Sequence, residues 1–333
     1  VTGLLDSTDV LRGGEGVDTL EAVVTGFDGT GVALRPVLED IENVKLELVD
    51  GDLNTADTST LNFDQTQGVD RLEFVNYDHG GTADTLKLIN IGKDDTVQIT
   101  NSLTTQADNA LEISYRDASG TDDSATVNLK STVDAGTGDL TVNDIENVTV
   151  ASTGAGGISY KLAAPDAKTV NIDSTPTGGG NVTVDAATAD TINVTSPDDL
   201  TLADAGSARD VSGLRTLNIT SETDGKTVTA TGLDLTATAN ADTVNATLSG
   251  VGDVSLSFTS SGTALDADDT IKVDTTGSTG TVTYTAQTGA KEDYDGGVGV
   301  DNVTLGATIA AGNDFDLGDG DDIFDMSTTI TAG

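Results

Sequence analysis

The 333-residue sequence predicts an all-β fold made of many short strands. Apolar residues alternate with Thr, Asn and other small polar residues over about five positions, which is the pattern of a strand with one buried face. Many of these runs recur every ten to twelve residues or so, an interval typical of solenoid faces or sandwich strands. Good helix formers do not recur at helical spacing over any long stretch, and only residues 204–214 carry a weak helical pattern.

The most specific motif is a glycine-rich turn near the start of the chain. Residues 13–20 read Gly-Gly-Glu-Gly-Val-Asp-Thr-Leu, which matches the pattern G-G-x-G-x-D-x-U-x that binds calcium in parallel β-rolls. Glycines permit a tight turn with positive φ and leave backbone carbonyls accessible, the Asp adds a carboxylate, and the aliphatic residue points into a core. Because calcium prefers about six to eight oxygen ligands, this motif predicts a calcium-binding β-roll turn.

The same motif returns near the end of the chain. Residues 296–303 match it fully, and residues 317–324 match it with Leu in place of the first Gly. These copies are isolated rather than tandem, so we expect other acidic turns, neighbouring coils or another subunit to complete each site. Carboxylates crowd the last copy, among them Asp319, which we include with the calcium candidates. Bound calcium would offset their mutual repulsion and couple metal binding to folding.

Shorter Asp-Thr-aliphatic repeats are interpreted as degenerate copies of the motif that keep the Asp and the core residue but lose the glycines. An equally open interpretation is that Asp-Thr merely begins a strand after a turn. The candidate calcium ligands from these copies are Asp84, Asp190, Asp242 and Asp269.

A third repeat indicates internal duplication. Residues 40–44 and 144–148 share the sequence Asp-Ile-Glu-Asn-Val, and each copy leads into a strand pattern. Repeats of this kind stack neighbour on neighbour and bury a continuous core. We expect one repeat module over 1–150 and a solenoid-like module over 151–333 that ends in calcium turns. For residues 50–290 the alternation allows either a parallel solenoid or an antiparallel sandwich.

The glycine turns resemble those of the RTX, or repeats-in-toxin, family. The Thr/Asn/Asp-rich strands and the Ile-Glu-Asn-Val elements resemble the RTX-bearing surface-layer proteins of Gram-negative bacteria. This resemblance implies type I secretion, folding on contact with calcium, and assembly of the chain with itself into a lattice or filament. It also implies several bound Ca²⁺ ions held by Asp carboxylates and backbone carbonyls. The ligands carried over in this way are Gly14, Gly16, Asp18, Gly297, Gly299, Asp301, Gly318, Gly320 and Asp322.

Composition excludes several classes of function. Fifty-six acidic and 15 basic residues give a net charge of −41, which disfavours nucleic acid and anionic membrane surfaces as partners. No apolar run approaches the roughly 20 residues needed to insert into a bilayer. The chain has no Cys and a single His, His79, so disulfides and common zinc sites are excluded. Without a nucleophile elbow or a zinc-protease motif, we expect no enzymatic activity.

These observations together predict a secreted structural protein of the bacterial cell surface that assembles with itself on binding calcium. Cell-surface polysaccharide is a further partner, through a region outside this segment. The first residue, Val1, is interpreted as the start of a processed chain or an excised segment. Two alternatives stay open: an adhesin or matrix segment of a larger RTX protein, and the calcium-binding accessory region of a secreted hydrolase.

Overall fold

The structure is a computed structural model, and its described residues contain strands and turns but no helix. The predicted all-β fold is therefore confirmed. The weak helical pattern was wrong for residues 211–214, which form a turn, and residues 205–210 lie outside the described part. The described residues are 5–27, 33–50, 58–75, 85–100, 110–131, 135–154, 157–175, 179–204, 211–235, 242–259, 265–305 and 311–326.

The chain divides into two compact units, Val1–Ala167 and Lys168–Gly333, which we call unit 1 and unit 2. Unit 1 contains a small sheet and two longer ones. The small sheet contains β1 (Val10–Arg12), β4 (Val37–Glu39) and β7 (Thr66–Gln67). The second sheet contains β2 (Thr19–Phe27), β5 (Asn43–Asp50), β8 (Arg71–Val75), β10 (Thr96–Thr100), β12 (Ser124–Ser131) and β14 (Asn147–Gly154). The third contains β3 (Ala33–Leu34), β6 (Thr58–Asn62), β9 (Thr85–Gly92), β11 (Ala110–Arg116), β13 (Ala135–Asn143) and β15 (Ile158–Ala163).

In unit 2 the strands alternate between two sheets, which we call the even sheet and the odd sheet. The even sheet contains β16 (Thr169–Ser174), β18 (Thr191–Ser196), β20 (Thr216–Ser221), β22 (Thr243–Gly250), β24 (Thr270–Ser278), β26 (Lys291–Asp295) and β28 (Asp314–Asp316). The odd sheet contains β17 (Gly180–Asp185), β19 (Leu200–Asp204), β21 (Thr227–Asp234), β23 (Asp253–Thr259), β25 (Val282–Thr285), β27 (Asp301–Thr304) and β29 (Ile323–Asp325).

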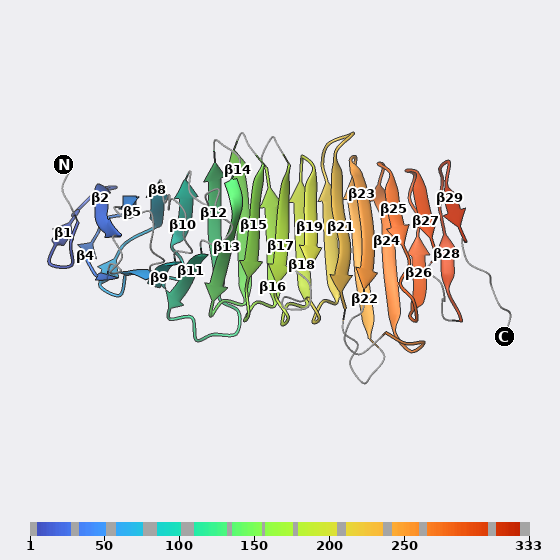
Figure 1. Ribbon diagram of the computed structural model, residues 1–333, viewed down its shortest axis with the longest axis horizontal. Coiled ribbons are helices and arrows are strands. Elements are labelled where there is room, and N and C mark those ends of the chain that lie inside the picture. Colours follow the sequence, from blue (N-terminus) through green and yellow to red (C-terminus); the bar gives the residue numbers. More distant parts are fainter. Residues whose placement is uncertain are drawn as a thin grey trace. The chain divides into compact units, whose positions relative to one another are not determined.

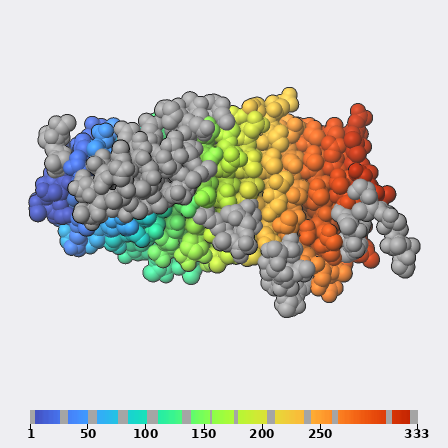
Figure 2. Space-filling model, in the orientation of Figure 1, coloured from blue at the N-terminus to red at the C-terminus, as the bar shows by residue number. Residues whose placement is uncertain are grey.

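Each turn of the chain adds one strand to each of two sheets. In unit 2, for example, β24 pairs with β26 and β26 pairs with β28, always in parallel (Figure 1). The space-filling view shows the coils of unit 2 as successive bands from green to red (Figure 2). This arrangement is a parallel β-solenoid, which confirms the predicted fold class. Within residues 50–290, the described strands form this solenoid and not an antiparallel sandwich.

The core of unit 2 is a stack of aliphatic side chains. Val170, Ile192 and Leu217 are register partners on β16, β18 and β20, and all three are fully buried. Because successive residues of a strand point to opposite faces, the alternation of apolar and polar residues buries every second side chain. The polar residues between them, such as Asn171 and Asn193, stack outward in the same register. Each coil is thereby held mainly by its neighbours.

The Asp-Ile-Glu-Asn-Val repeat forms a corner that ties one coil of unit 1 to the coil before it. Asp40 has a positive φ of 52°, Ile41 is buried, and Glu42 Oε2 accepts a hydrogen bond of 2.7 Å from the Asp18 backbone N–H. Positive φ is tolerated by Asp better than by most residues, which explains the first position of the repeat. In the second copy the corresponding residues are Asp144, Ile145, Glu146 and Asp123.

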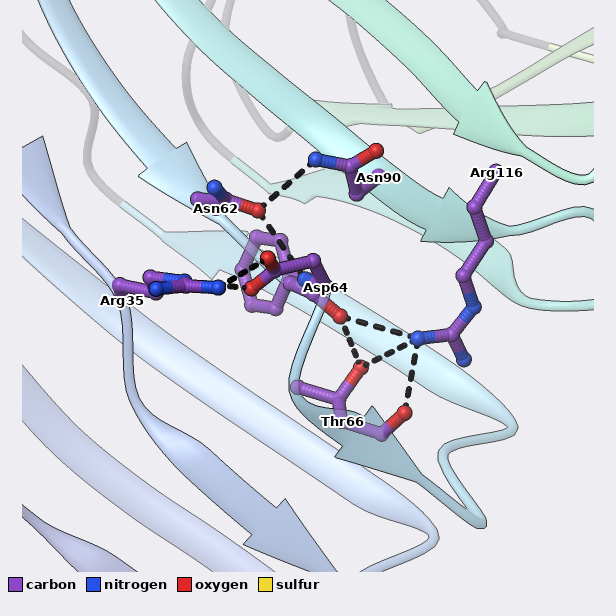
Figure 3. Close-up of polar contacts among 7 residues, drawn as sticks. Arg35, Asn62, Asp64, Thr66, Asn90 and Arg116 are labelled. Atoms are coloured by element: carbon purple, nitrogen blue, oxygen red, sulfur yellow. Dashed lines mark hydrogen bonds and ion pairs between the residues drawn. The ribbon is translucent and has the colours of Figure 1, made fainter.

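Polar side chains also connect coils of unit 1 (Figure 3). Arg35 holds Asp64 with two contacts, 2.8 Å to Oδ1 and 2.5 Å to Oδ2. Arg116 Nη1 donates to the carbonyl oxygens of Phe63 and Thr66 at 3.0 and 2.7 Å, although these residues are 53 and 50 positions away in the chain. The Arg116 side chain thereby supplies a donor to two backbone carbonyls of an earlier coil.

Candidate metal centre at the glycine turns

The first glycine turn, residues 13–18, owes its shape to positive φ angles. Gly14 and Gly16 have φ values of 101° and 125°, and a Cβ added to either would meet no other atom. Both residues are exposed. Backbone geometry therefore requires glycine here, because L side chains rarely adopt such angles. The turn leads directly from β1 to Asp18 and β2.

The Asp18 carboxylate has one oxygen without a partner. The Asp18 carbonyl accepts a hydrogen bond of 3.1 Å from the Asn43 N–H, so its backbone is tied to the next coil. Asp18 Oδ2, in contrast, is buried without a hydrogen-bond partner among the described residues. This oxygen and the Asp40 carbonyl oxygen both lie against Gly13, where a Cβ would collide with them. An unpartnered buried carboxylate oxygen is unfavourable, and these two oxygens are of the hard type that calcium prefers as ligands.

The second glycine turn, residues 296–301, is shaped instead by close contact between coils. A Cβ on Gly299 would collide with the carbonyl oxygen of Gly280 in the preceding coil. A Cβ on Gly320 would collide with the carbonyl oxygen of Gly299 in the same way. The looser copy at residues 317–324 thus lies one coil beyond the second motif and stacks on it. Glycine is required at these positions because backbone approaches backbone.

Backbone and carboxylate hydrogen bonds hold this stack together. The Gly297 carbonyl accepts a hydrogen bond of 2.8 Å from the Asp319 N–H of the next coil. Gly318, with a φ of 74°, donates its N–H to Asp316 Oδ1 at 3.0 Å. Asp319 and Gly320 themselves are exposed at the end of the described stack.

Among the sequence-predicted ligands that the structure describes, Asp301 has the best-satisfied carboxylate. It is 1% exposed, and its Oδ1 accepts hydrogen bonds from the Tyr294 hydroxyl at 2.5 Å and the Thr275 hydroxyl at 3.2 Å. Its Oδ2 accepts from the Gly297 N–H at 3.3 Å. The Asp301 N–H in turn donates to Asp322 Oδ1 at 2.9 Å, 21 residues further on. In this conformation the carboxylate cross-links the core, and calcium binding at Asp301 stays a prediction.

A second buried acid lies beside this network. Glu292 is 1% exposed, and it accepts hydrogen bonds from the Tyr284 hydroxyl at 2.6 Å and the Gln287 N–H at 2.8 Å. Burial raises the pKa of Glu292 to about 8, because the charged form is poorly solvated in the core. The Tyr284 ring stacks on the Tyr294 ring with centroids 5.7 Å apart, so the two acid–tyrosine pairs form one cluster.

The structure brings two of the degenerate copies together and leaves one apart. Asp269 is 3% exposed, and its carboxylate accepts hydrogen bonds from the N–H groups of Asp266 at 2.8 Å and Asp242 at 2.9 Å. Asp242 and Asp269 therefore meet on adjacent coils. Asp190 is exposed, its carboxylate accepts from the Thr191 hydroxyl at 2.9 Å, and none of its described contacts is with another predicted ligand.

Carboxylates also line up on the outer face of the even sheet. Asp274, Asp295 and Asp316 are register partners on β24, β26 and β28. Neighbouring strands are about 4.8 Å apart, so each of these Asp residues lies about that far from the next one. Even so, no group of three or more His, Cys, Asp or Glu side chains in the described part of the chain has the arrangement of a metal site. Asp84 and His79 lie outside the described residues.

A surface cavity of about 310 Å³ in unit 1 gathers charges of both signs, including Lys93, Asp95, Arg116 and Asp117. Asp95 is 7% exposed, and burial raises its pKa to about 6 even though the Gly92 N–H donates to it at 2.9 Å. Sequence reasoning did not single out this cavity because its residues come from separate coils.

Sequence reasoning also missed the acids that accept hydrogen bonds from neighbouring coils. Glu42 and Glu146 occupy the same position in the two copies of the Asp-Ile-Glu-Asn-Val repeat. That shared position was a signal in the sequence that the two acids have the same role. Glu292 has no such signal, because its burial depends on Tyr284 and Gln287 in the preceding strand and turn.

Comparisons of the chain with protein-family models, curated proteins and solved structures found no match. The described residues include no helix that is long and apolar enough to cross a membrane.

Proposed function

We propose that this chain is a calcium-stabilised structural protein of the bacterial cell surface that assembles with copies of itself. The observation that carries the proposal is the last described coil of unit 2. Among the described strands, β28 and β29 are the last of their sheets and have a partner on one side only. Ile323, Phe324 and Met326 are 59%, 37% and 50% exposed there. An unpaired strand edge with exposed apolar side chains favours pairing with another chain.

Calcium has two roles in this proposal. At the first glycine turn, Asp18 Oδ2 and the Asp40 carbonyl would hold an ion that supplies the partner the carboxylate lacks. At the last described coil, the aligned carboxylates of Asp295 and Asp316 would repel one another and an approaching copy. Several bound ions would relieve that repulsion, so assembly would depend on calcium.

Location and partners follow from the same properties. A chain without Cys and with a net charge of −41 suits a calcium-rich exterior, and the resemblance to RTX surface-layer proteins supports type I secretion. The chain itself is the main partner, with cell-surface polysaccharide bound through a region outside this segment. The proposal assigns no enzymatic role.

The test is a calcium titration of EDTA-stripped protein, followed by far-UV circular dichroism and by negative-stain electron microscopy of the same samples. We expect a cooperative gain of β signal together with ordered sheets or filaments. Dispersed particles that bind glycans or host cells would support the adhesin alternative instead. A spectrum and particle distribution that do not respond to calcium would contradict the proposal.

A further inference from the structure

Two central columns of outward residues on the odd sheet of unit 2 carry no charge, and we call these two columns the odd face. Asp185 at the end of β17 and Asp253 at the start of β23 border it. The first column is aligned by the parallel register from β17 to β27 and consists of Asn181, Thr201, Thr229, Ser255, Thr283 and Asn302. The second column lies two residues further along each strand and is also uncharged, from Thr183 on β17 to Thr304 on β27.

This absence of charge is unusual for a chain with a net charge of −41. On the outer face of unit 1, Lys87 on β9 faces Glu112 on β11 at 2.6 Å. On the even sheet of unit 2, Lys272 on β24 faces Asp293 on β26 at 3.3 Å. The fold therefore accommodates charged residues on its outer faces, so it does not itself impose their absence from the odd face.

The odd face also differs from the uncharged half of the even sheet in its hydrogen bonding. On the even sheet, Asn193 Nδ2 donates to Asn171 Oδ1 at 2.7 Å, and Asn218 continues the ladder at 2.7 Å. On the odd face, the hydroxyls of Thr229 and Thr283 have no hydrogen-bond partner among the described residues. These two hydroxyls thus keep hydrogen-bonding capacity that the described part of the fold does not use.

We propose that the odd face is the surface through which two copies of this chain contact each other side by side. This inference rests on the self-assembly proposed above. A second copy is equally acidic, so repulsion restricts close approach to surfaces without carboxylates. Two identical odd faces related by a two-fold axis would place uncharged residues against each other, and the hydroxyls of Thr229 and Thr283 could pair across the contact.

The size of the odd face indicates a weak contact. Adjacent strands lie about 4.8 Å apart, so the six strands β17 to β27 span about 24 Å. With two outward residues per strand, the flat area falls below the roughly 800 Å² per partner of a stable interface. Such a contact would persist only where each copy is also held by other contacts, as in a lattice.

The experiment adds negative charge to the odd face. We compare Thr229→Asp/Thr283→Asp on β21 and β25 with the matched pair Thr169→Asp/Thr216→Asp on β16 and β20 of the even sheet. Both pairs replace threonines on outward positions two strands apart in their own sheet. Circular dichroism and thermal unfolding in calcium should show that both variants fold like the wild type. The critical concentration for assembly should rise at least about tenfold for the odd-face pair only, which corresponds to about 1.4 kcal/mol.

A cross-linking measurement detects the contact directly. Because the chain has no Cys, Ser255→Cys places a single thiol at the centre of the odd face, and Asn193→Cys places one on the even sheet. Under mild oxidation of calcium-assembled protein, disulfide-linked dimers should accumulate with Ser255→Cys and not with Asn193→Cys.

The outcomes separate this inference from the proposed function. If the wild type assembles and the odd-face pair assembles equally well, the odd face is not the contact, whereas self-assembly stands. If the odd-face pair assembles but no longer co-sediments with an insoluble cell-wall polysaccharide, the face binds sugar and the inference is overturned. If the wild type fails to assemble at all, both proposals fall.

Discussion

Residues 13–20 and 296–303 carry the same glycine–aspartate pattern, yet different interactions hold the two turns. In the first, exposed glycines adopt positive φ angles and Asp18 keeps a buried oxygen without a partner. In the second, buried glycines stack against neighbouring coils and Asp301 is hydrogen-bonded by Tyr294. The pattern therefore specifies a chain path, and the neighbouring coils decide whether the Asp has an oxygen free for a cation or serves as a core cross-link.

The largest expected effect distinguishes these roles directly. Asp301→Ala leaves the Tyr294 hydroxyl and the Gly297 N–H without an acceptor in the core. We expect the free energy of unfolding to fall by about 4 kcal/mol in calcium and in EDTA alike, as measured by urea denaturation. The exposed Asp268→Ala is the control and should change it by less than about 0.5 kcal/mol. A loss confined to calcium-containing buffer would mean that Asp301 acts as a metal ligand instead.

The glycines should respond differently in the two turns. Gly299→Ala forces a Cβ into the Gly280 carbonyl and should lower the free energy of unfolding by about 3 kcal/mol. Gly16→Ala meets no atom but strains a φ of 125°, so about 1 to 2 kcal/mol is expected. Thermal unfolding of both variants in EDTA checks the order. Equal losses would show that the two turns are not distinguished by packing.

Glu292, on the strand before the second turn, should also make stability depend on pH. The folded pKa of Glu292, about 8, lies above its ordinary value of 4.5, so the folded state binds more protons between these pH values. Stability from this group is complete below about pH 4.5 and is lost as pH rises toward 8. Glu292→Gln should match the wild type at pH 5 and exceed it at pH 9 by on the order of 2 kcal/mol in urea denaturation. Parallel pH profiles for both proteins would contradict this assignment.

The smallest effect concerns the first turn and calcium itself. Asp18→Asn removes a charged oxygen that lacks a partner, so we expect no loss of stability in EDTA. In millimolar calcium the wild type should gain stability by mass action while the variant gains about 1 to 2 kcal/mol less. Differential scanning calorimetry with and without calcium measures the two shifts. If Asp18→Asn and the wild type gain equally, the ion binds elsewhere.

The strands could be predicted from the sequence because alternation is a local property. Val170-Asn171-Ile172 reads as a strand wherever it lies, and it forms part of β16. Alternation does not report whether strands pair in parallel, which explains why a sandwich stayed open for residues 50–290. The predicted boundary near residue 151 stays a prediction, and the two compact units meet between Ala167 and Lys168.

The candidate site was harder to predict because its partners lie one coil away. The sequence marks Asp301 as a ligand, but its hydrogen bonds to Tyr294 and Thr275 depend on how β24, β26 and β27 stack. The separation between coil partners varies, so no fixed offset identifies them in advance. Asp18 and Asp301 were equivalent in sequence and became different only through their neighbours.

The variable length of the coils has an evolutionary consequence. Within unit 2, Asp301 bonds to Asp322 across 21 residues, whereas Thr220 meets Ser249 across 29. The corners absorb this difference while the strands keep their register. A gene for such a protein could therefore gain or lose whole coils, or enlarge a single corner, without redesigning the remaining core. The number of coils that the gene encodes would then set the length of the solenoid.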